Sequence, residues 1–128
     1  MSIGYVTIGA ADVDAALPFF DAALGAMGYE RGEPSGGWAF YGPKGGSPCV
    51  GICRPHDGEA ARAGNGIMIA FRAETQDQVR AAHAAALAAG GSDEGAPGFR
   101  PPEGTEFYGA YFRDLDGNKL CVYRMERQ

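Results

Sequence analysis

The same order of predicted elements occurs twice along this chain, and that repetition constrains the fold more than any other feature. Residues 3–10 are rich in β-branched side chains, as in a strand, and Asp12 follows where a helix cap belongs. An amphipathic helix and three short strand segments come next, separated by glycine and proline. After a polar stretch, residues 67–72 and the helix cap Thr75 begin the same order again. The sequence therefore predicts two βαβββ modules.

Two offsets align the halves of the chain. A shift of 63 positions places Asp12 on Thr75, and a shift of 72 places Cys49 on Cys121 in the closing hairpins. We therefore predict an α+β fold in which the two modules form a cupped, mostly antiparallel sheet. The expected organisation is a single domain, with module one at about 1–53, a linker at about 54–66 and module two at about 67–128.

Turn and cap residues set the expected bounds of the elements. Gly25 stands where the residue after the first helix belongs, and Thr75 with Gln78 forms a capping box for the second helix. That second, alanine-rich helix is expected to end at Gly90, and the cluster at 114–118 fits a hairpin turn. Strands are expected at about 3–10, 27–33, 37–42, 48–53, 67–72, 94–99, 107–113 and 118–124.

Composition and charge exclude several classes of protein. The net charge is -5, without a basic run that would neutralise phosphates, so we expect no nucleic-acid partner. No apolar stretch is long enough for a membrane span and no leader pattern begins the chain, so we expect a cytoplasmic protein with no membrane partner. Three cysteines fit neither zinc spacing nor a disulfide framework. Because 22 residues are alanine, the core is thin, and we expect a homodimer that buries more apolar surface.

Three segments carry a resemblance to a known family. They are GYVTIGAADVDAALPFFDAALGAMGYE, GNGIMIAFRAETQDQVRAAHAAALAAGGSDEGAPG and FYGAYFRDLDGNKLCVY. Together they resemble the glyoxalase/bleomycin resistance/extradiol dioxygenase superfamily, also called the vicinal oxygen chelate (VOC) superfamily. The resemblance covers nearly the whole chain. It implies the VOC fold and, as in metal-dependent members, a divalent metal held by His and Glu from the first and last strands of the modules.

The residues at those implied metal positions do not suit that role. The positions fall on Tyr5, Cys49, Met68 and Cys121. None is histidine or a carboxylate, and the chain has only two histidines, His56 in the linker and His83 on an apolar helix face. We therefore expect no cofactor, with a divalent metal held by an atypical ligand set as the alternative. Sulfur at three of the positions also permits a soft cation or a redox pair, but apolar lining is the favoured interpretation.

Strand alternation predicts which side chains line the cleft. It places Tyr5 and Thr7 in the cleft, with Ile8 facing the first helix. It also directs Ile67 toward the second helix, and it leaves open whether the aromatic residues of the neighbouring strands point inward. The predicted lining is Tyr5, Thr7, Trp38, Cys49, Met68, Arg72, Tyr108, Cys121 and Tyr123, with Arg100 in the loop at the cleft edge.

These expectations favour a binding function. The predicted cleft suits a flat or hydrophobic small molecule, and Arg72 and Arg100 would add positive charge for an anionic ligand. The leading hypothesis is a metal-free VOC protein that binds a small molecule, as the bleomycin resistance proteins of the resembled family do. The alternative is a glyoxalase-type lyase, isomerase or dioxygenase. Such an enzyme would be metal-dependent with an atypical ligand set, or metal-independent with Tyr5 or Tyr123 as the acid or base.

Overall fold

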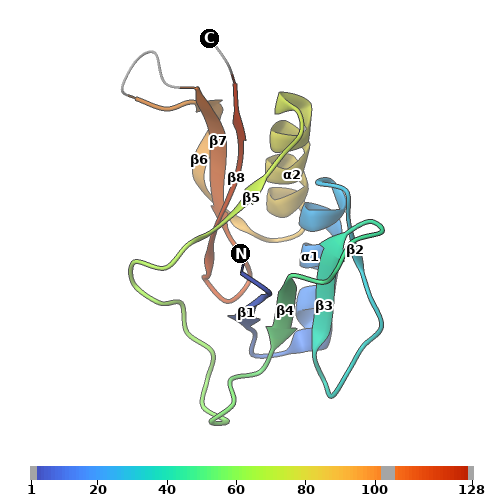
Figure 1. The fold of residues 1–128 in the computed structure, drawn as a ribbon. Coiled ribbons are helices and arrows are strands. Elements are labelled where there is room, and N and C mark those ends of the chain that lie inside the picture. Colours follow the sequence, from blue (N-terminus) through green and yellow to red (C-terminus); the bar gives the residue numbers. More distant parts are fainter. Residues whose placement is uncertain (1–2, 102–105, 127–128) are drawn as a thin grey trace.

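The computed structural model describes residues 3–101 and 106–126, which form two helices and two four-stranded sheets (Figure 1). The first module contains β1 (Val6–Gly9), α1 (Val13–Gly25), β2 (Tyr29–Arg31), β3 (Ala39–Pro43) and β4 (Val50–Cys53). The second contains β5 (Ile69–Arg72), α2 (Gln76–Ala88), β6 (Ser92–Phe99), β7 (Phe107–Arg113) and β8 (Lys119–Met125). The order along the chain is βαβββ twice, which confirms the predicted α+β fold class.

The two sheets have the same topology. The strand order is β1-β4-β3-β2 in the first sheet and β5-β8-β7-β6 in the second. In each sheet the first strand pairs in parallel with the last strand of its module, and the other pairs are antiparallel. Figure 1 shows α2 beside the second sheet and α1 behind β3 and β4 of the first. Each sheet therefore has one face against a helix and an opposite face, which we call its open face.

Both helices begin at the predicted caps. The Asp12 carboxylate accepts a hydrogen bond from the Ala15 amide, and the Thr75 hydroxyl accepts one from the Gln78 amide, each at 3.1 Å. These bonds satisfy amides that have no partner within the helix. The Gln78 side chain reaches back to the amide of Glu74, one residue earlier than a capping box requires.

The end of α1 differs from the expectation. Gly25 belongs to the helix, and the left-handed glycine that follows is Gly28, with φ of 83°. The expectation was wrong because the amide of Ala26 still bonds to the Ala22 carbonyl and continues the helical pattern for another residue. The end of α2 is close to the prediction: the helix ends at Ala88, Ala89 is its cap, and the left-handed glycine that follows the cap is Gly90, with φ of 103°.

One hydrophobic core serves both modules. Helices α1 and α2 pack against each other at its centre. Phe19 of α1 lies edge-on to Phe112 of β7, with 6.1 Å between ring centroids, and Tyr29 of β2 lies edge-on to Phe71 of β5 at 5.8 Å. The modules therefore share their apolar contacts, which helps a chain with so many alanines to bury enough surface.

The alternation predicted for the first strand of each module holds within the strands. Ile8 and Phe71 are buried against the helices, whereas Thr7 and Arg72 are exposed on the open faces. Ile67, which we expected against the second helix, is 68% exposed. The expectation failed because β5 begins only at Ile69, so strand alternation does not reach back to that residue.

The turn between β7 and β8, residues 114–118, joins the second module to the first. The Asn118 side-chain amide donates to the Gly9 carbonyl at 3.0 Å and to the Asp114 carboxylate at 2.9 Å. The Asp116 carboxylate accepts a hydrogen bond from the Ala11 amide at 2.9 Å. We call residues 114–118 the junction turn, because they fix the end of β1 and the start of α1 in place. Within residues 3–101 and 106–126, no helix has the length and apolar character to cross a membrane.

Candidate functional site

The open face of the first sheet carries an aromatic pair. Gly36 and Gly37 both have positive φ, 59° and 83°, and so form the tight turn that pairs Ser35 with Trp38. This turn places the Trp38 indole over Phe40, stacked with 5.5 Å between centroids and 26° between ring planes. Together the two rings form a flat apolar surface.

Gly51 makes room for that pair. It lies opposite Phe40 in the ladder between β3 and β4, and a Cβ atom there would come within 2.9 Å of the Trp38 ring. The missing side chain lets the indole lie close to the sheet. Tyr5, which is 57% exposed, meets the edge of Trp38 at 6.3 Å between centroids. The structure thus brings the predicted residues Tyr5 and Trp38 together.

The open face of the second sheet combines aromatic rings with cations. Phe107 and Tyr123 are stacked in parallel at 5.2 Å between centroids. The Arg100 guanidinium lies 5.2 Å from the centroid of Tyr111, and the Lys119 ammonium lies 5.4 Å from the same centroid. Both distances are within the range for cation–π attraction.

Cys121 lies fully buried beneath these groups, opposite Tyr111 in the ladder. Burial raises the pKa of the Cys121 thiol to about 11, although a hydrogen bond with Tyr111 and the charges of Arg100 and Lys119 oppose this rise. Burial also raises the pKa of the Tyr111 phenol. At neutral pH both groups are therefore protonated, so neither is a ready base or nucleophile.

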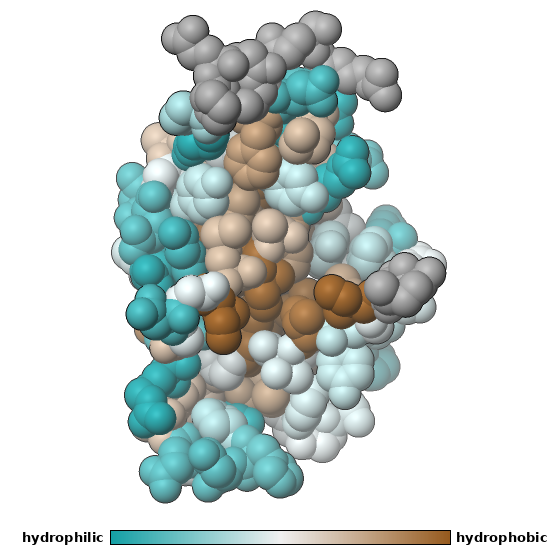
Figure 2. Space-filling model, turned by 60° about the vertical axis from the view of Figure 1, so that its left-hand side comes forward, coloured by the Kyte–Doolittle hydropathy of each residue, from teal (hydrophilic) through white to brown (hydrophobic). Residues whose placement is uncertain are grey.

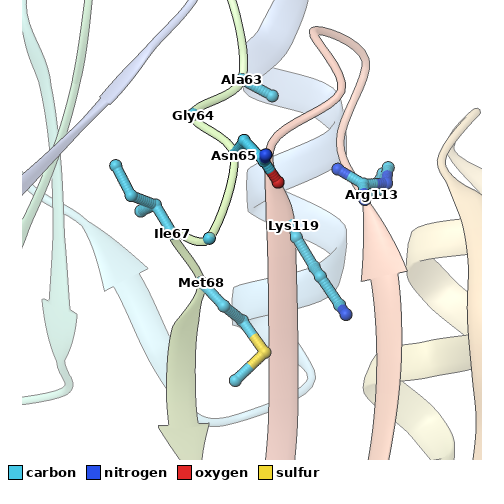
Figure 3. A pocket seen from close by; sticks show the side chains of 8 residues that line it. Ala63, Gly64, Asn65, Ile67, Met68, Arg113 and Lys119 are labelled. Atoms are coloured by element: carbon cyan, nitrogen blue, oxygen red, sulfur yellow. The ribbon is translucent and has the colours of Figure 1, made fainter.

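Two cavities lie where the linker crosses the second sheet. The larger, about 490 Å³, is lined by linker residues 63–67 together with Met68, Arg113 and Lys119 (Figure 3). The smaller, about 170 Å³, reaches the end of β1 and includes Thr7. Both cavities contain Gly64, Ile67 and Lys119, so they adjoin one another. The larger has the volume of a small-molecule site.

Two predicted lining residues lie elsewhere. Tyr108 is buried on the helix-facing side of β7, where its hydroxyl accepts a hydrogen bond from Arg80 at 3.0 Å. Cys49 packs against the core, with its sulfur 4.0 Å from the hydroxyl of Tyr29. Tyr108 lies an odd number of positions before the open-face residue Tyr111 in β7, so the two side chains point to opposite faces of the sheet. Cys49 lies just before β4, so strand alternation does not apply to it.

Several residues of the site were not predicted. Phe107 and Tyr111 lie with the aromatic and charged groups described above. Phe40, whose orientation the sequence left open, and Lys119, which shares a face with Cys121 and Tyr123 but was not assigned to the lining, lie there as well. The sequence held the signal for Phe107 and Tyr111, because the junction turn fixes the register between β7 and β8. With Cys121 and Tyr123 placed on one face, that register puts Tyr111 and Phe107 on the same face.

The residues at the family's metal positions do not suit a metal. Tyr5 and Met68 offer a phenol and a thioether, Cys121 is a protonated thiol at neutral pH, and Cys49 packs against the core. Divalent zinc, iron and manganese bind imidazole, carboxylate or thiolate. Across the described ranges, no three His, Cys, Asp or Glu side chains lie close enough together to hold a metal ion.

The comparison with known families agrees with this architecture. The sequence model of the Glyoxalase/Bleomycin resistance protein/Dioxygenase superfamily matches residues 2–122. The chain belongs to this superfamily. No protein of curated function matches this superfamily member.

Several solved structures share the fold. A glyoxalase/bleomycin resistance protein from Albidiferax ferrireducens T118 is 37% identical, with a TM-score of 0.83, and the match covers 94% of this chain and 95% of that one. A glyoxalase/bleomycin resistance protein/dioxygenase family enzyme from Burkholderia phytofirmans PsJN is 20% identical, with a TM-score of 0.73 and coverage of 98% and 99%. The oxidase ChaP-H2 is 18% identical, with a TM-score of 0.66 and coverage of 99% and 95%.

Proposed function

We propose that this superfamily member binds a flat, apolar small molecule on its open faces, without a metal or other cofactor. The observation that carries the proposal is the Trp38–Phe40 stack, which lies over the space that Gly51 leaves free. A half-buried stack of two aromatic rings on an open sheet face is a surface on which a planar ligand can lie. A separate cavity of about 490 Å³, at Met68 and Lys119 on the open face of the second sheet, is a second hollow of suitable volume.

The metal-free part of the proposal follows from donor chemistry. A catalytic metal site needs about three ligands and an open position, and the family positions supply one phenol, one thioether and two thiols. Elemental analysis tests this part directly. We expect near-zero metal after incubation with zinc, nickel, manganese or ferrous iron and desalting, whereas one tightly held ion per chain would contradict the proposal.

We further propose that a second copy of the chain completes the cleft. Large apolar side chains near the starts of β1 and β5 are exposed, among them Ile3 at 76% and Ile67 at 68%. Figure 2 shows strongly apolar side chains gathered in the middle of one face, with hydrophilic residues on either side. Among the described residues, no strand of one sheet pairs with a strand of the other. Burial of such a patch is the usual reason for association between copies.

Neutral aromatic probes test the binding function. We would use benzamide, 2-naphthamide and anthracene-2-carboxamide, and would measure thermal stability together with the fluorescence of Trp38, the only tryptophan in the chain. At least one probe is expected to raise the melting temperature, since a ligand at 100 times its Kd adds about 2.7 kcal/mol. The Trp38→Ala variant is expected to lose this stabilisation.

The matched control is Phe99→Ala. Phe99 is aromatic and 52% exposed, but it contacts Tyr108 on the helix side of the second sheet. This variant is expected to bind the probes as the unaltered protein does. Absence of stabilisation by all three probes would contradict the binding proposal, and turnover of a compound would favour the enzyme alternative.

A further inference from the structure

We propose that His83 and Asp93 act together as positioning residues, which hold a bulge of β6 in register and thereby keep Arg100 on the open face of the second sheet. His83 is one of two histidines in the chain, and the proposed function makes no use of it. This role goes beyond the proposed function, because it concerns how the open face is built and its tests do not measure ligand binding.

Strand β6 carries an extra residue directly after Asp93. Asp93 lies opposite Phe112 of β7 and Gly95 lies opposite Tyr111, so two steps along β6 match one step along β7. If this extra residue were paired regularly, the strand beyond it would slip by one position and its side chains would point to the opposite face. The bulge therefore decides which face Arg100, the residue after β6, occupies.

One carboxylate oxygen of Asp93 closes the bulge and ties it to α2. It accepts a hydrogen bond from the Gly95 amide at 2.9 Å and lies 3.0 Å from Nε2 of His83. The hydrogen bonds with His83 and with the Gly95 amide lower the pKa of Asp93, so this group carries no proton at neutral pH. The hydrogen between the two side chains therefore belongs to Nε2 of His83, which can donate whether the ring is neutral or charged.

His83 is a fixed point for this bond. It is buried, with 7% of its surface exposed, and its ring meets Phe112 edge-on with 6.3 Å between centroids. Helix α2 packs against β6, β7 and β8, whereas β6 is the last strand of its sheet and pairs, among the described strands, with β7 alone. The bond from His83 thus fixes an edge strand to the helix beside it.

The same bulge shapes the surroundings of Arg100. A Cβ atom on Gly95 would lie 3.0 Å from the Tyr111 ring and 3.1 Å from the Arg100 guanidinium, so residue 95 lies against both groups. The guanidinium donates to two carbonyls of β6, at 2.7 and 2.9 Å, and lies 5.2 Å from the Tyr111 centroid. A continuous set of contacts therefore leads from His83, beneath α2, to the open face.

Nuclear magnetic resonance of the full ¹⁵N-labelled chain tests this role. We expect the Nε–H resonance of Arg100 to lie upfield because the side chain lies over the Tyr111 ring, and Tyr111→Leu gives the reference position without that ring. Asp93→Ala removes the acceptor, and His83→Phe removes the donor while it keeps an aromatic ring. Each is expected to lose the upfield shift, so that the resonance moves to the reference position.

Conservative variants separate positioning from a general loss of stability. Asp93→Asn keeps an acceptor oxygen and His83→Gln keeps a donor nitrogen, so both are expected to leave the Arg100 resonance in place. The control Asp77→Ala also removes an exposed carboxylate, one that pairs with Arg80 within α2, and is expected to leave the resonance in place. Circular dichroism of every variant checks that it is folded.

Two results from the variants would overturn the proposal. One is an Arg100 resonance that stays upfield in both Asp93→Ala and His83→Phe, and the other is an equal displacement in Asp77→Ala. The imidazole ¹⁵N shifts give a further test that does not depend on the folding of these variants. We expect Nε2 of His83 to carry a proton at pH 8, with His56→Gln used to assign the two histidines. An unprotonated Nε2 would overturn the proposal, because Asp93 would then have no donor in His83.

Discussion

At the scale of single residues, Gly51 decides where the Trp38 indole can lie. We predict that Gly51→Ala moves the indole off the sheet, because the new methyl carbon would lie 2.9 Å from the ring. The loss of stacking should weaken 2-naphthamide binding by about threefold to tenfold, in line with aromatic pairs of about 0.5–1.5 kcal/mol. A red shift of Trp38 emission would report the greater exposure.

Gly9→Ala is the matched control for that variant. Gly9 lies in the same sheet, and a Cβ atom there makes only ordinary contact, 3.6 Å from Ala61. The Trp38 emission of Gly9→Ala and its affinity for 2-naphthamide should match those of the unaltered protein. Unchanged emission in Gly51→Ala would show that the indole does not depend on this glycine.

Cys121 links the site to pH at the same scale. An unfolded thiol has an ordinary pKa of 9.0, and the buried Cys121 has a pKa of about 11. Between these values the unfolded chain releases a proton that the folded protein keeps, so the free energy of unfolding falls as pH rises from 9 to 11. Below pH 9 the thiol has no such effect. The difference of two pKa units corresponds to a loss of at most about 3 kcal/mol in the free energy of unfolding.

Urea denaturation at pH 8, 9.5 and 11 measures this fall. Cys121→Ala should show a smaller loss of stability over the same range, because the remaining alkaline effect comes from groups such as Tyr29, whose pKa burial raises to about 12. If the free energy of unfolding fell equally with pH in the two proteins, the assignment of this effect to Cys121 would be contradicted. The same raised pKa predicts slow alkylation of Cys121 by iodoacetamide at pH 7.5.

At the scale of elements, two glycines at helix ends differ in what surrounds them. A Cβ atom on Gly91 would lie 2.6 Å from the Arg113 carbonyl oxygen and 2.7 Å from Phe19, whereas one on Gly25 meets nothing within 4 Å. We predict that Gly91→Ala lowers the free energy of unfolding by about 1–3 kcal/mol through overpacking. Gly25→Ala should raise it by about 0.5–1 kcal/mol, because it lies within α1.

Chemical denaturation of both variants gives the comparison. The two substitutions add the same methyl group, so their difference isolates the local surroundings. A loss of stability of the same size in both would mean that the close approach at Gly91 is not what constrains this position.

Local signals predicted most elements because they depend on neighbours in sequence. Asp12 and Thr75 cap their helices, and the junction turn sets the last hairpin, as expected from those residues alone. Strand ends were harder to predict. The exposure of Ile67 and the inward turn of Cys49 depend on where pairing with a partner strand begins, and that is fixed by residues far away in sequence.

The candidate site was predicted in part for the same reason. Thr7 and Arg72, which alternation assigned to the cleft, are exposed on the open faces of the sheets, and alternation gave no reason to place Arg100 on the Tyr111 ring. That contact depends on the irregular register of β6 around Gly95, where two shifts interrupt the ladder. A bulge of this kind changes which face a side chain occupies and leaves little trace in the pattern of residues.

At the scale of the whole molecule, Asn118 connects the modules. Asn118→Ala removes the donor to the Gly9 carbonyl and to the buried Asp114 carboxylate. We predict a loss of about 1–3 kcal/mol in the free energy of unfolding, because both acceptors lose a partner. Asn65→Ala, in the exposed linker, serves as the control and should change stability by less than about 0.5 kcal/mol. Equal effects of the two variants would contradict the role of the junction turn.

The proposed homodimer predicts a particular response to charge at Ile67. Sedimentation equilibrium should give a mass of twice 13.4 kDa for the unaltered protein. Ile67→Glu should give the monomer mass, because it places a charge in the apolar patch that the second copy covers. Leu115→Glu changes another exposed apolar side chain, 48% exposed, in the junction turn and should remain dimeric. A monomer in all three samples would refute the dimer.

The junction turn also has a consequence for synthesis. Ribosomes add about 5–20 residues per second, and domains generally begin to fold from the N-terminus as the chain emerges. Asn118 is made 109 residues after its partner Gly9, and Asp116 is made 105 residues after its partner Ala11. Until then, these two native hydrogen bonds cannot form. A nascent chain that stalls before Asp116 therefore leaves the end of β1 and the start of α1 without these two hydrogen bonds.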